Sequence, residues 1–345
     1  MKEIKIIAFT GKKNDPSSRF RIRQYKKILS ENNILLNEYT SRVGKYPPSN
    51  KLVRPIWLAF VVLERLFQVI YSNFHKTQIT FLQREMISSL HTFESCISKP
   101  IIFDVDDAIH LRQRTSNSLD KICGNVNAII CGNQYLYNYY KKYEVDTYII
   151  PTAIDTDIYV PKDIERDYTV IGWIGSSSNF ESLYKIQDAM KILLDSYPSV
   201  VFRVIADKNP QFSNNLKYQF FSWSMEKEIT YIQDFDIGIM PLVESEWSKG
   251  KCSFKMLQYM SCGKPVVVSP IGMNVEVFEK GTVGLSPVNY FEDWIGDLEQ
   301  LINDNVLRKL MGKEGRRVVL ENYSIKVCGL MLARVMKEVV RKNQQ

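Results

Sequence analysis

The stretch of sequence that decides the fold reads DIGIMPL at residues 236–242, KGKCSFKMLQYM at 249–260 and SCGKPVVVS at 261–269. The first and last of these segments contain short runs of Ile and Val, which are typical of buried strands. The middle segment predicts a helix from about Ser253 to Ser261. A strand, a helix and a second strand in this order predict a βαβ unit with a parallel sheet.

The same alternation of short apolar runs and longer periodic segments extends along the rest of the chain. The apolar runs predict strands at Ile4–Phe9, Ile34–Tyr39, Gln78–Leu82, Pro100–Phe103, Ala128–Cys131, Thr147–Ile150, Val170–Ile174, Val200–Ile205, Asp236–Pro241 and Pro265–Ser269. Asp15-Pro16 predicts the start of a helix that continues through Tyr25, because Asp is a preferred N-cap and Pro a preferred first helical residue. A second helix is predicted from Phe180 to Tyr197. The aromatic run Phe220–Trp223 and Trp173 are expected in the core rather than stacked on a nucleotide base.

The length of 345 residues suits two domains. A polar, proline-bounded stretch after Pro151 separates the two series of strands. We therefore predict an α/β protein with two facing Rossmann-like domains that have parallel sheets, at residues 1–160 and 161–325. Residues 326–345 are predicted to form a C-terminal helix that packs back on the first domain. A ligand of such sheets is expected outside the carboxyl ends of the strands.

Composition and motifs exclude several classes of protein. Hydrophobic residues make up 45% and charged residues 24% of the chain, as in ordinary globular proteins. The six cysteines have neither CxxC spacing nor zinc-site neighbours, so we expect reduced thiols and no metal site. The sequence lacks four common motifs: GxGxxG, the P-loop motif, GxSxG and HExxH. Dinucleotide-binding, P-loop, hydrolase and metalloprotease functions therefore have no support from the sequence. The chain has neither a long enough apolar run for a membrane span nor a signal-peptide core, so we expect a cytoplasmic protein.

Positive charge is concentrated in the first half of the chain. Residues 1–150 contain 22 Lys and Arg against 13 Asp and Glu, a net charge of +9, whereas the rest of the chain has a net charge of −2. This asymmetry predicts an anionic partner: a phosphorylated substrate, a membrane surface or, least of all because no recognition motif is present, nucleic acid. The apolar run Ile56–Leu63, flanked by Lys45, Lys51, Arg54 and Arg65, has two interpretations. It is a core helix of the first domain, or an interfacial helix that binds anionic lipid.

The stretch from 236 to 274 closely resembles the donor-binding core of the GT-B glycosyltransferases of the group-one, family-four class. The segments that extend this resemblance to nearly the whole chain, and that look like a bacterial branch of the class, are Gly172–Ser176, Ser269–Asn274, Asn322–Ser324, Ser17–Arg21, Phe103–Asp107 and Ile150–Asp155. The resemblance implies GT-B architecture and transfer of a sugar from a nucleotide-diphosphate donor that lies against the second domain. It also implies retention at the anomeric carbon, with no metal ion and no other cofactor.

The chain departs from the pattern of that class at three places. Gly250 and Gln258 stand at the two positions of its E-x7-E motif, and the resemblance assigns Gln258 to the donor ribose, which its amide can still bond. The donor-binding loop Gly175-Ser176-Ser177 lacks the Arg and Lys with which many relatives hold the diphosphate. Asp106 stands where relatives often have a catalytic His.

Lys251 and Lys255 are the cations that we expect to bind the diphosphate. They lie four residues apart where the loop at Gly250 leads into the helix near Ser253. Both can then project from the first helical turn toward an anion that the unpaired N–H groups favour. The alternative is that both are solvated surface lysines.

Asp106, with Asp107 beside it, is the predicted catalytic pair on the acceptor side. These two carboxylates and Asp104 lie close in sequence, so mutual repulsion predicts at least one perturbed pKa. Alternatively, the three aspartates cap a helix that begins at Ala108. His110 could approach Asp106 on one face of that helix, although a solvated histidine is the simpler interpretation.

Ser18 and Arg19, near the start of the first helix, are the predicted acceptor or phosphate ligands. Together with the basic first half they predict an anionic acceptor. The resemblance implies that this acceptor is an anionic or lipid-linked glycan, in the synthesis of a bacterial surface polysaccharide at the inner face of the membrane. The predicted function is a glycosyltransferase that binds a nucleotide-sugar donor and no nucleic acid. Two alternatives share the fold: a nucleotide-sugar epimerase, which needs no acceptor, and a non-catalytic sugar-nucleotide-binding protein in which Gly250 and Gln258 have replaced the acidic pair.

Overall fold

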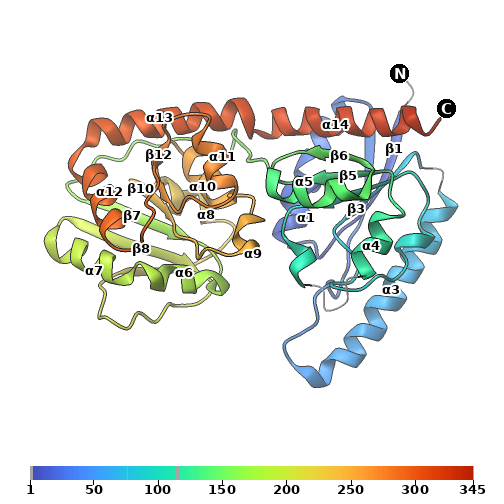
Figure 1. The fold of residues 1–345 in the computed structure, drawn as a ribbon, viewed down its shortest axis with the longest axis horizontal. Coiled ribbons are helices and arrows are strands. Elements are labelled where there is room, and N and C mark those ends of the chain that lie inside the picture. The colour runs from blue at the N-terminus through green and yellow to red at the C-terminus, as the bar shows by residue number, and fades with distance from the viewer. Residues whose placement is uncertain (1–2, 76, 113–116, 345) are drawn as a thin grey trace. The chain divides into compact units, whose positions relative to one another are not determined.

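The computed structural model describes residues 3–75, 77–112 and 117–344. It divides the chain into two compact units (Figure 1). Unit 1 contains Met1–Ala153, Gly250–Cys252 and Ile325–Gln345, and unit 2 contains Ile154–Lys249 and Ser253–Ser324. Each unit has its own sheet and its own apolar core, so each is described by itself.

Unit 1 is built on a six-stranded parallel sheet. Its strands are β1 (Ile4–Phe9), β2 (Ile34–Tyr39), β3 (Ile79–Gln83), β4 (Ile101–Val105), β5 (Ala128–Cys131) and β6 (Asp146–Ile149). They lie in the order β2-β1-β3-β4-β5-β6, and every neighbouring pair is parallel. The strand order reverses between β1 and β3, and the carboxyl ends of these strands therefore form the crevice where α/β sheets bind ligands.

The helices of unit 1 come from both ends of the chain. They are α1 (Pro16–Arg21), α2 (Lys26–Glu31), α3 (Arg54–Phe74), α4 (Asn117–Cys123), α5 (Gln134–Tyr140) and α14 (Ile325–Lys342), with short 3-10 turns between several of them. The core of the unit joins strand residues such as Ile6 and Phe81 to Leu29 of α2 and to Leu332 and Met336 of α14. The last helix thus completes a core that the first residues of the chain begin (Figure 1).

Unit 2 contains a second six-stranded parallel sheet. Its strands are β7 (Thr169–Ile174), β8 (Val200–Ala206), β9 (Gln219–Ser222), β10 (Ile237–Met240), β11 (Val266–Val268) and β12 (Gly284–Leu285), in the order β12-β11-β10-β7-β8-β9. Its helices are α6 (Phe180–Lys185), α7 (Gln187–Ser196), α8 (Glu228–Gln233), α9 (Glu246–Lys249), α10 (Phe254–Ser261), α11 (Met273–Phe278), α12 (Glu292–Asn303) and α13 (Asn305–Asn322). The strand order reverses between β7 and β10, which places the crevice of this sheet after Ile174 and Met240.

The two parallel sheets confirm the predicted α/β class with two Rossmann-like domains. Two predicted helices are wrong in extent. The helix expected from Asp15 to Tyr25 is broken at Ile22, whose φ of −141° is not helical, and the helix expected from Phe180 to Tyr197 is broken at Ile186. Both isoleucines are buried, so tertiary packing overrides the local periodicity there.

The aromatic run Phe220–Trp223 belongs to the core only in part: Phe220 packs against the core of unit 2. The run overlaps the edge strand β9, which pairs only with β8, and Phe221 and Trp223 are 37% and 41% exposed. Trp173, in contrast, is buried as expected.

The chain passes into unit 2 before residue 160. The carbonyl oxygen of Tyr159 accepts hydrogen bonds from Arg316 (2.6 Å) and from the hydroxyl of Ser261 (2.8 Å), and Arg316 also donates to Thr156 O. These bonds hold the residues after Ala153 on unit 2, seven residues ahead of the boundary placed from sequence.

Candidate functional site

Gly175 and Lys255 lie together at the carboxyl end of β7 in unit 2. A Cβ added to Gly175 would stand 2.5 Å from Lys255 Cε and 2.8 Å from the Trp173 ring, so a glycine is needed to leave room for the lysine side chain. Lys255 Nζ lies 5.7 Å from the centre of the Trp173 ring, on whose face a cation is favoured. Lys255 belongs to the first turn of α10, where the unpaired N–H groups of a helix lie. The structure thus joins two of the predicted donor-binding residues at the crevice of the sheet.

The serines that follow Gly175 are engaged within their own loop. Ser176 Oγ accepts a hydrogen bond from Ser178 N (3.4 Å), which caps a 3-10 turn at Ser177–Asn179. Ser177 donates twice to Asp207, from its backbone N (2.6 Å) and from its hydroxyl (2.8 Å). Slight burial acts to raise the pKa of Asp207, but these two bonds lower it. A phosphate at Ser177 would therefore compete with a carboxylate for the same donors.

A separate set of contacts fixes the start of α10. Ser253, at the N-cap position, has a left-handed backbone with φ of 49°, and its hydroxyl donates to Asn274 Oδ1 (2.6 Å). Asn274 Nδ2 in turn donates to Ser269 O (2.8 Å). Gly272 lies next to this pair at φ of 56°, and a Cβ there would stand 2.6 Å from Lys249 O. These bonds position the first turn of α10, and with it Lys255.

Lys251 is not in the first turn of α10, and the expectation of two lysines on one helical turn is wrong. The segment Gly250–Cys252 belongs to unit 1. Its contacts there are specific: Asn133 Nδ2 donates to Lys251 O (3.0 Å), and Cys252 Sγ donates to Asp106 O (3.2 Å). The left-handed turn at Ser253 separates this segment from the helix. Burial lowers the pKa of Lys251, and Asp107 partly offsets that effect.

Gln258 lies in a buried hydrogen-bond network of unit 2. Its Nε2 donates to the hydroxyl of Tyr159 (3.1 Å) and to Glu228 Oε1 (3.1 Å). Tyr159 OH also donates to Glu228 Oε1, and Trp223 Nε1 donates to Glu228 Oε2 (2.7 Å). A glutamate at position 258 would bring a second carboxylate against Glu228 in a buried place, which like charges disfavour. The amide is therefore the group that fits beside Glu228, and this accounts for the departure from the E-x7-E pattern.

Two of the three aspartates in unit 1 form buried ion pairs at the carboxyl ends of β3 and β4. Asp104 pairs with Arg21 of α1 at 2.6 Å, and both side chains are at most 2% exposed. Arg84 directly follows Gln83 of β3. Its Nε donates to Asp106 Oδ1 at 2.5 Å, and its Nη2 lies 3.6 Å from Asp107 Oδ2. Asp104 therefore receives its arginine from α1, and Asp106 receives its arginine from the end of β3.

The ionisation of Asp106 and Asp107 differs because their arginine contacts differ. Burial acts to raise the pKa of Asp106, but the charge and hydrogen bond of Arg84 outweigh it and lower that pKa to about 2. Burial raises the pKa of Asp107, with a weaker opposing effect from Arg84. The expected perturbation is present: burial and Arg84 are its largest causes, and the neighbouring charge of Asp106 also raises the pKa of Asp107. Asp106 therefore remains a carboxylate at neutral pH.

The helix-cap interpretation of the three aspartates is wrong. Asp107 Oδ1 accepts a bond from Ala108 N (3.1 Å), but the element that follows is a 3-10 turn at Ile109–Arg112, and no α-helix begins at Ala108. His110 lies in that turn and stacks on Tyr139, with ring centres 3.9 Å apart. It is not the solvated helical histidine expected from sequence.

Arg84 was not identified from the sequence, and Lys45 was named there only as a cation beside the apolar run Ile56–Leu63. Lys45 is buried, and its Nζ donates to Gln83 O (3.1 Å) and Oε1 (3.2 Å). Burial, with a contribution from Arg84, lowers the pKa of Lys45 to about 7. A signal for Arg84 was present, because it lies two residues beyond the predicted strand Gln78–Leu82, near the end of a strand where ligand-binding residues of parallel sheets lie. No local pattern marks Lys45, which reaches the sheet from a loop.

Ser18 contacts the first loop of unit 1, whereas Arg19 contacts Phe20 of its own helix. Ser18 is buried, and its hydroxyl accepts a bond from Gly11 N (2.9 Å). The guanidinium of Arg19 lies 4.8 Å from the centre of the Phe20 ring. Asp15 accepts a bond from Lys12 N (2.8 Å), and its side chain makes no cap bond to α1. Ser18 and Asp15 thus shape the loop after β1, one of the two strands at the crevice.

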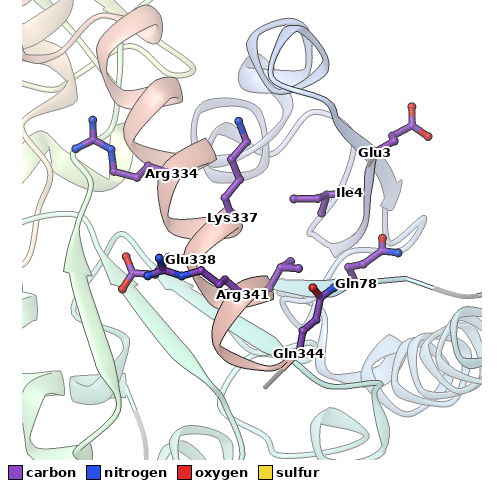
Figure 2. Close-up of a pocket in the computed structure, with 9 residues that line it drawn as sticks. Glu3, Ile4, Gln78, Arg334, Lys337, Glu338, Arg341 and Gln344 are labelled. Atoms are coloured by element: carbon purple, nitrogen blue, oxygen red, sulfur yellow. The ribbon is translucent and has the colours of Figure 1, made fainter. Parts of the chain in front are cut away.

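A pocket lies at the opposite ends of the strands of unit 1 (Figure 2). Its lining residues are Glu3, Ile4, Gln78, Arg334, Lys337, Glu338, Val340, Arg341 and Gln344, from the amino ends of β1 and β3 and from α14. None of the predicted site residues lines it. Within residues 3–75, 77–112 and 117–344, no group of three or more His, Cys, Asp or Glu is arranged to hold a metal ion. In the same part of the chain, no helix combines the length and hydropathy needed to cross a membrane.

Part of the chain matches known proteins in sequence. Residues 168–304 match the family described as "Glycosyl transferases group 1". Over 116 residues the chain is 33% identical to an uncharacterized glycosyltransferase, MJ1069, of Methanocaldococcus jannaschii, and this match covers 33% of the chain and 29% of that protein. The chain therefore matches less than a third of the length of that curated relative.

Two solved structures have the same fold over nearly the whole chain. Sucrose-phosphate synthase from Thermosynechococcus elongatus superposes with a TM-score of 0.71 at 12% identity, covering 99% of this chain and 100% of that one. HepE from Anabaena, in complex with UDP and glucose, superposes with a TM-score of 0.65 at 13% identity, covering 97% and 100% of the two chains. At these identities the likeness concerns the fold.

Proposed function

We propose that this chain, whose residues 168–304 belong to the group 1 glycosyl transferases and whose fold is GT-B, transfers a sugar from a nucleotide-diphosphate donor to an acceptor. The observation that carries the proposal is the contact of Lys255 with Gly175 at the crevice of unit 2, within the residues that match the family. HepE was solved with UDP and glucose, which supports a nucleotide-sugar donor here as well.

The donor diphosphate is proposed to lie beside Lys255. A nucleoside diphosphate carries about two negative charges that leave water on binding, and a cation at the first turn of a helix opposes that cost. The backbone of Gly175 lies next to the lysine and would meet the phosphates without a side chain of its own. The hydroxyl of Ser177 is proposed as a further donor to the diphosphate, after its release from Asp207.

Unit 1 is proposed to bind the acceptor. Asp106 is ionised at neutral pH, so its role would be to orient an acceptor hydroxyl or to stabilise positive charge on the sugar, rather than to donate a proton. In the transfer, the bond from the anomeric carbon to the diphosphate oxygen breaks, a bond to the acceptor oxygen forms, and the proton of the acceptor hydroxyl passes to the departing diphosphate. We propose retention at the anomeric carbon, because the resemblance to the family-four class implies it.

The acceptor is proposed to be an anionic or lipid-linked glycan of a bacterial surface polysaccharide, met at the cytoplasmic face of the membrane. The net charge of +9 in residues 1–150 supports an anionic acceptor. Ser18 and Arg19 remain the proposed acceptor-side anion ligands, although Ser18 is buried and bonded to Gly11.

The test is incubation of the full chain with single nucleotide sugars, with and without glycan acceptors. Slow release of free sugar from one donor, accelerated or diverted into a new glycoside by an acceptor, is the expected result. Conversion of one nucleotide sugar into its epimer without acceptor would show an epimerase instead. Donor binding in calorimetry with neither hydrolysis nor transfer would show a non-catalytic binding protein.

Lys255→Met is expected to weaken binding of the nucleoside diphosphate about tenfold or more, because a charge-assisted hydrogen bond is lost. Binding of the unphosphorylated nucleoside should stay unchanged, and Lys255→Arg should retain part of the affinity. Lys313→Met, which removes an exposed lysine of α13, is the matched control. Isothermal titration calorimetry measures all four proteins, and equal losses for both ligands would remove Lys255 from the diphosphate site.

A further inference from the structure

Helix α3 of unit 1 presents an apolar stripe to solvent. The residues of this outer stripe are Ile56, Phe60, Leu63, Phe67, Ile70 and Phe74, and each is between 45% and 83% exposed. Their spacing of three and four residues places them on one face of the helix. Figure 1 shows the first turns of α3 (blue) projecting away from the sheet of unit 1.

The buried face of α3 is more polar than its exposed face. Val61, Arg65, Val69 and Ser72 are the buried residues of the helix. Arg65 donates to Thr10 O (2.5 Å) and Gln68 to Thr40 O (2.9 Å), so polar groups attach the helix to unit 1. This is the reverse of the usual arrangement, in which the polar face of a surface helix meets water. The core-helix interpretation of Ile56–Leu63 is therefore wrong for the outer stripe.

Cations accompany the N-terminal end of the stripe. Lys51 and Arg54 are exposed there, next to Leu52, which is 86% exposed. The only acidic residue of α3 is Glu64, and its carboxylate is engaged by the hydroxyl of Ser41 (2.7 Å) and the backbone N of Arg42 (2.8 Å). The surface around the stripe is thus apolar and positive, in a region with net charge +9. A second copy of the chain would bring like charges together, whereas an anionic lipid surface complements both properties.

We propose that the outer stripe of α3 docks unit 1 on a bilayer that contains anionic lipid. The helix would lie in the plane of the interface, with Phe60 and Phe67 among the acyl chains and with Lys51 and Arg54 at the headgroups. At 21 residues, α3 is about 30 Å long, so the stripe presents several turns to the surface at once. The reason for the docking rests on the proposed function, in which the acceptor is lipid-linked. The docking itself can be measured without any sugar transfer.

The experiment is flotation of the full chain with vesicles of phosphatidylcholine, pure or mixed with phosphatidylglycerol. The wild type is expected to float with the mixed vesicles and to be released by salt. The double variant Phe60→Ser/Phe67→Ser is expected to lose at least about tenfold in partitioning, because two large apolar side chains no longer enter the bilayer. The variant Lys51→Ala/Arg54→Ala is expected to bind the mixed vesicles more weakly than the wild type. Its remaining binding should no longer depend on salt.

The matched control is Val306→Ser/Leu310→Ser on α13 of unit 2. Its two residues are 69% and 61% exposed, compared with 62% and 67% for Phe60 and Phe67, and it should bind vesicles like the wild type. All variants change exposed side chains, so equal thermal midpoints verify their folding. Equal flotation of wild type and Phe60→Ser/Phe67→Ser would overturn the proposal.

A second set of results would also contradict the proposal. In it, light scattering shows that the wild type is a dimer and that Phe60→Ser/Phe67→Ser is a monomer, and the wild type does not bind vesicles. Donor hydrolysis is measured on the same preparations. Flotation without donor hydrolysis would contradict only the proposed function. Donor hydrolysis without flotation would contradict only the proposed docking.

Discussion

At the scale of single residues, Gln258 links a departure in sequence to its surroundings. Its amide donates to Glu228, which already accepts bonds from Tyr159 and Trp223. The network joins α10, α8 and the chain segment that enters unit 2. An acidic residue at 258 would satisfy the family pattern but would place two carboxylates in contact inside the protein.

Gln258→Glu is therefore expected to lower the free energy of unfolding at pH 7.5 by roughly 3 kcal/mol, the cost of keeping one carboxyl protonated or of burying both charges. The new pair holds a proton that the unfolded chain releases, so its pKa is raised in the folded state. The loss should then shrink as pH falls from 7.5 to 5. Urea unfolding at both values measures it, with the exposed Gln211→Glu as control; a loss that does not depend on pH would refute the carboxylate contact.

Asp106→Asn tests the ion pair with Arg84. The pKa of Asp106 is lowered to about 2 in the fold, below its usual value near 3.9, so the carboxylate stabilises the protein above about pH 4. This contribution, about 2 kcal/mol, is lost as pH falls from about 4 to about 2. The variant should be less stable than the wild type at pH 7 by at least this amount, because Arg84 also loses its buried partner.

The difference between the two proteins should narrow on acidification toward pH 2. Urea denaturation curves at pH 7 and pH 3 provide the measurement, with the exposed Asp163→Asn as the comparison. A stability difference that is constant with pH would contradict the pKa assigned to Asp106. A folded variant with full transferase activity would restrict Asp106 to a structural role.

At the scale of elements, α14 matters because it completes the core of unit 1. Gly329 is packed so closely that an added Cβ would stand 2.5 Å from Ile28, and Met336 is fully buried. The helix therefore contributes packing that the first 153 residues do not provide for themselves.

Met336→Ala is expected to destabilise the protein by about 2–5 kcal/mol, because a buried side chain is replaced by a cavity. Leu330→Ala on the same helix, where the side chain is 45% exposed, should change stability by less than about 0.5 kcal/mol. Chemical denaturation compares the two variants with the wild type. Similar small effects from both would mean that α14 is loosely attached.

At the scale of the whole molecule, unit 1 is assembled from three separate segments of the chain. The chain leaves unit 1 after Ala153, returns for Gly250–Cys252, and returns again from Ile325. Unit 2 contains its own core, which includes Trp173, Phe202 and Trp294 and no residue of α14. Stability of the two units is therefore expected to respond differently to changes near the C-terminus.

A chain that ends at Ser324 is expected to lose protection in unit 1 and to keep it in unit 2. Removal of α14 exposes buried apolar residues of the remaining core, among them Ile6 and Leu29. Hydrogen exchange of peptides from β1 and β8 measures the two units in one experiment, with the full chain as reference. Equal loss of protection in both peptides would show that the units do not unfold separately.

The fold class and most strands could be predicted from the sequence, because strands that are buried on both faces leave continuous local runs of apolar residues. β1, β2 and β5 have the predicted bounds, and most other predicted strands differ by one or two residues at an end. The glycosyltransferase segment around 236–274 was also readable, because its residues are contiguous.

Only the tertiary structure decided which side chains meet. Arg84 and Asp106 are 22 residues apart, Glu228 and Gln258 are 30, and Arg21 and Asp104 are 83, and no local pattern records such pairs. It also decided that Lys251 lies with unit 1 and that the apolar stripe of α3 faces outward. Hydropathy is a property of the residue type alone. Whether a side chain is buried depends on which distant segments the fold packs against it.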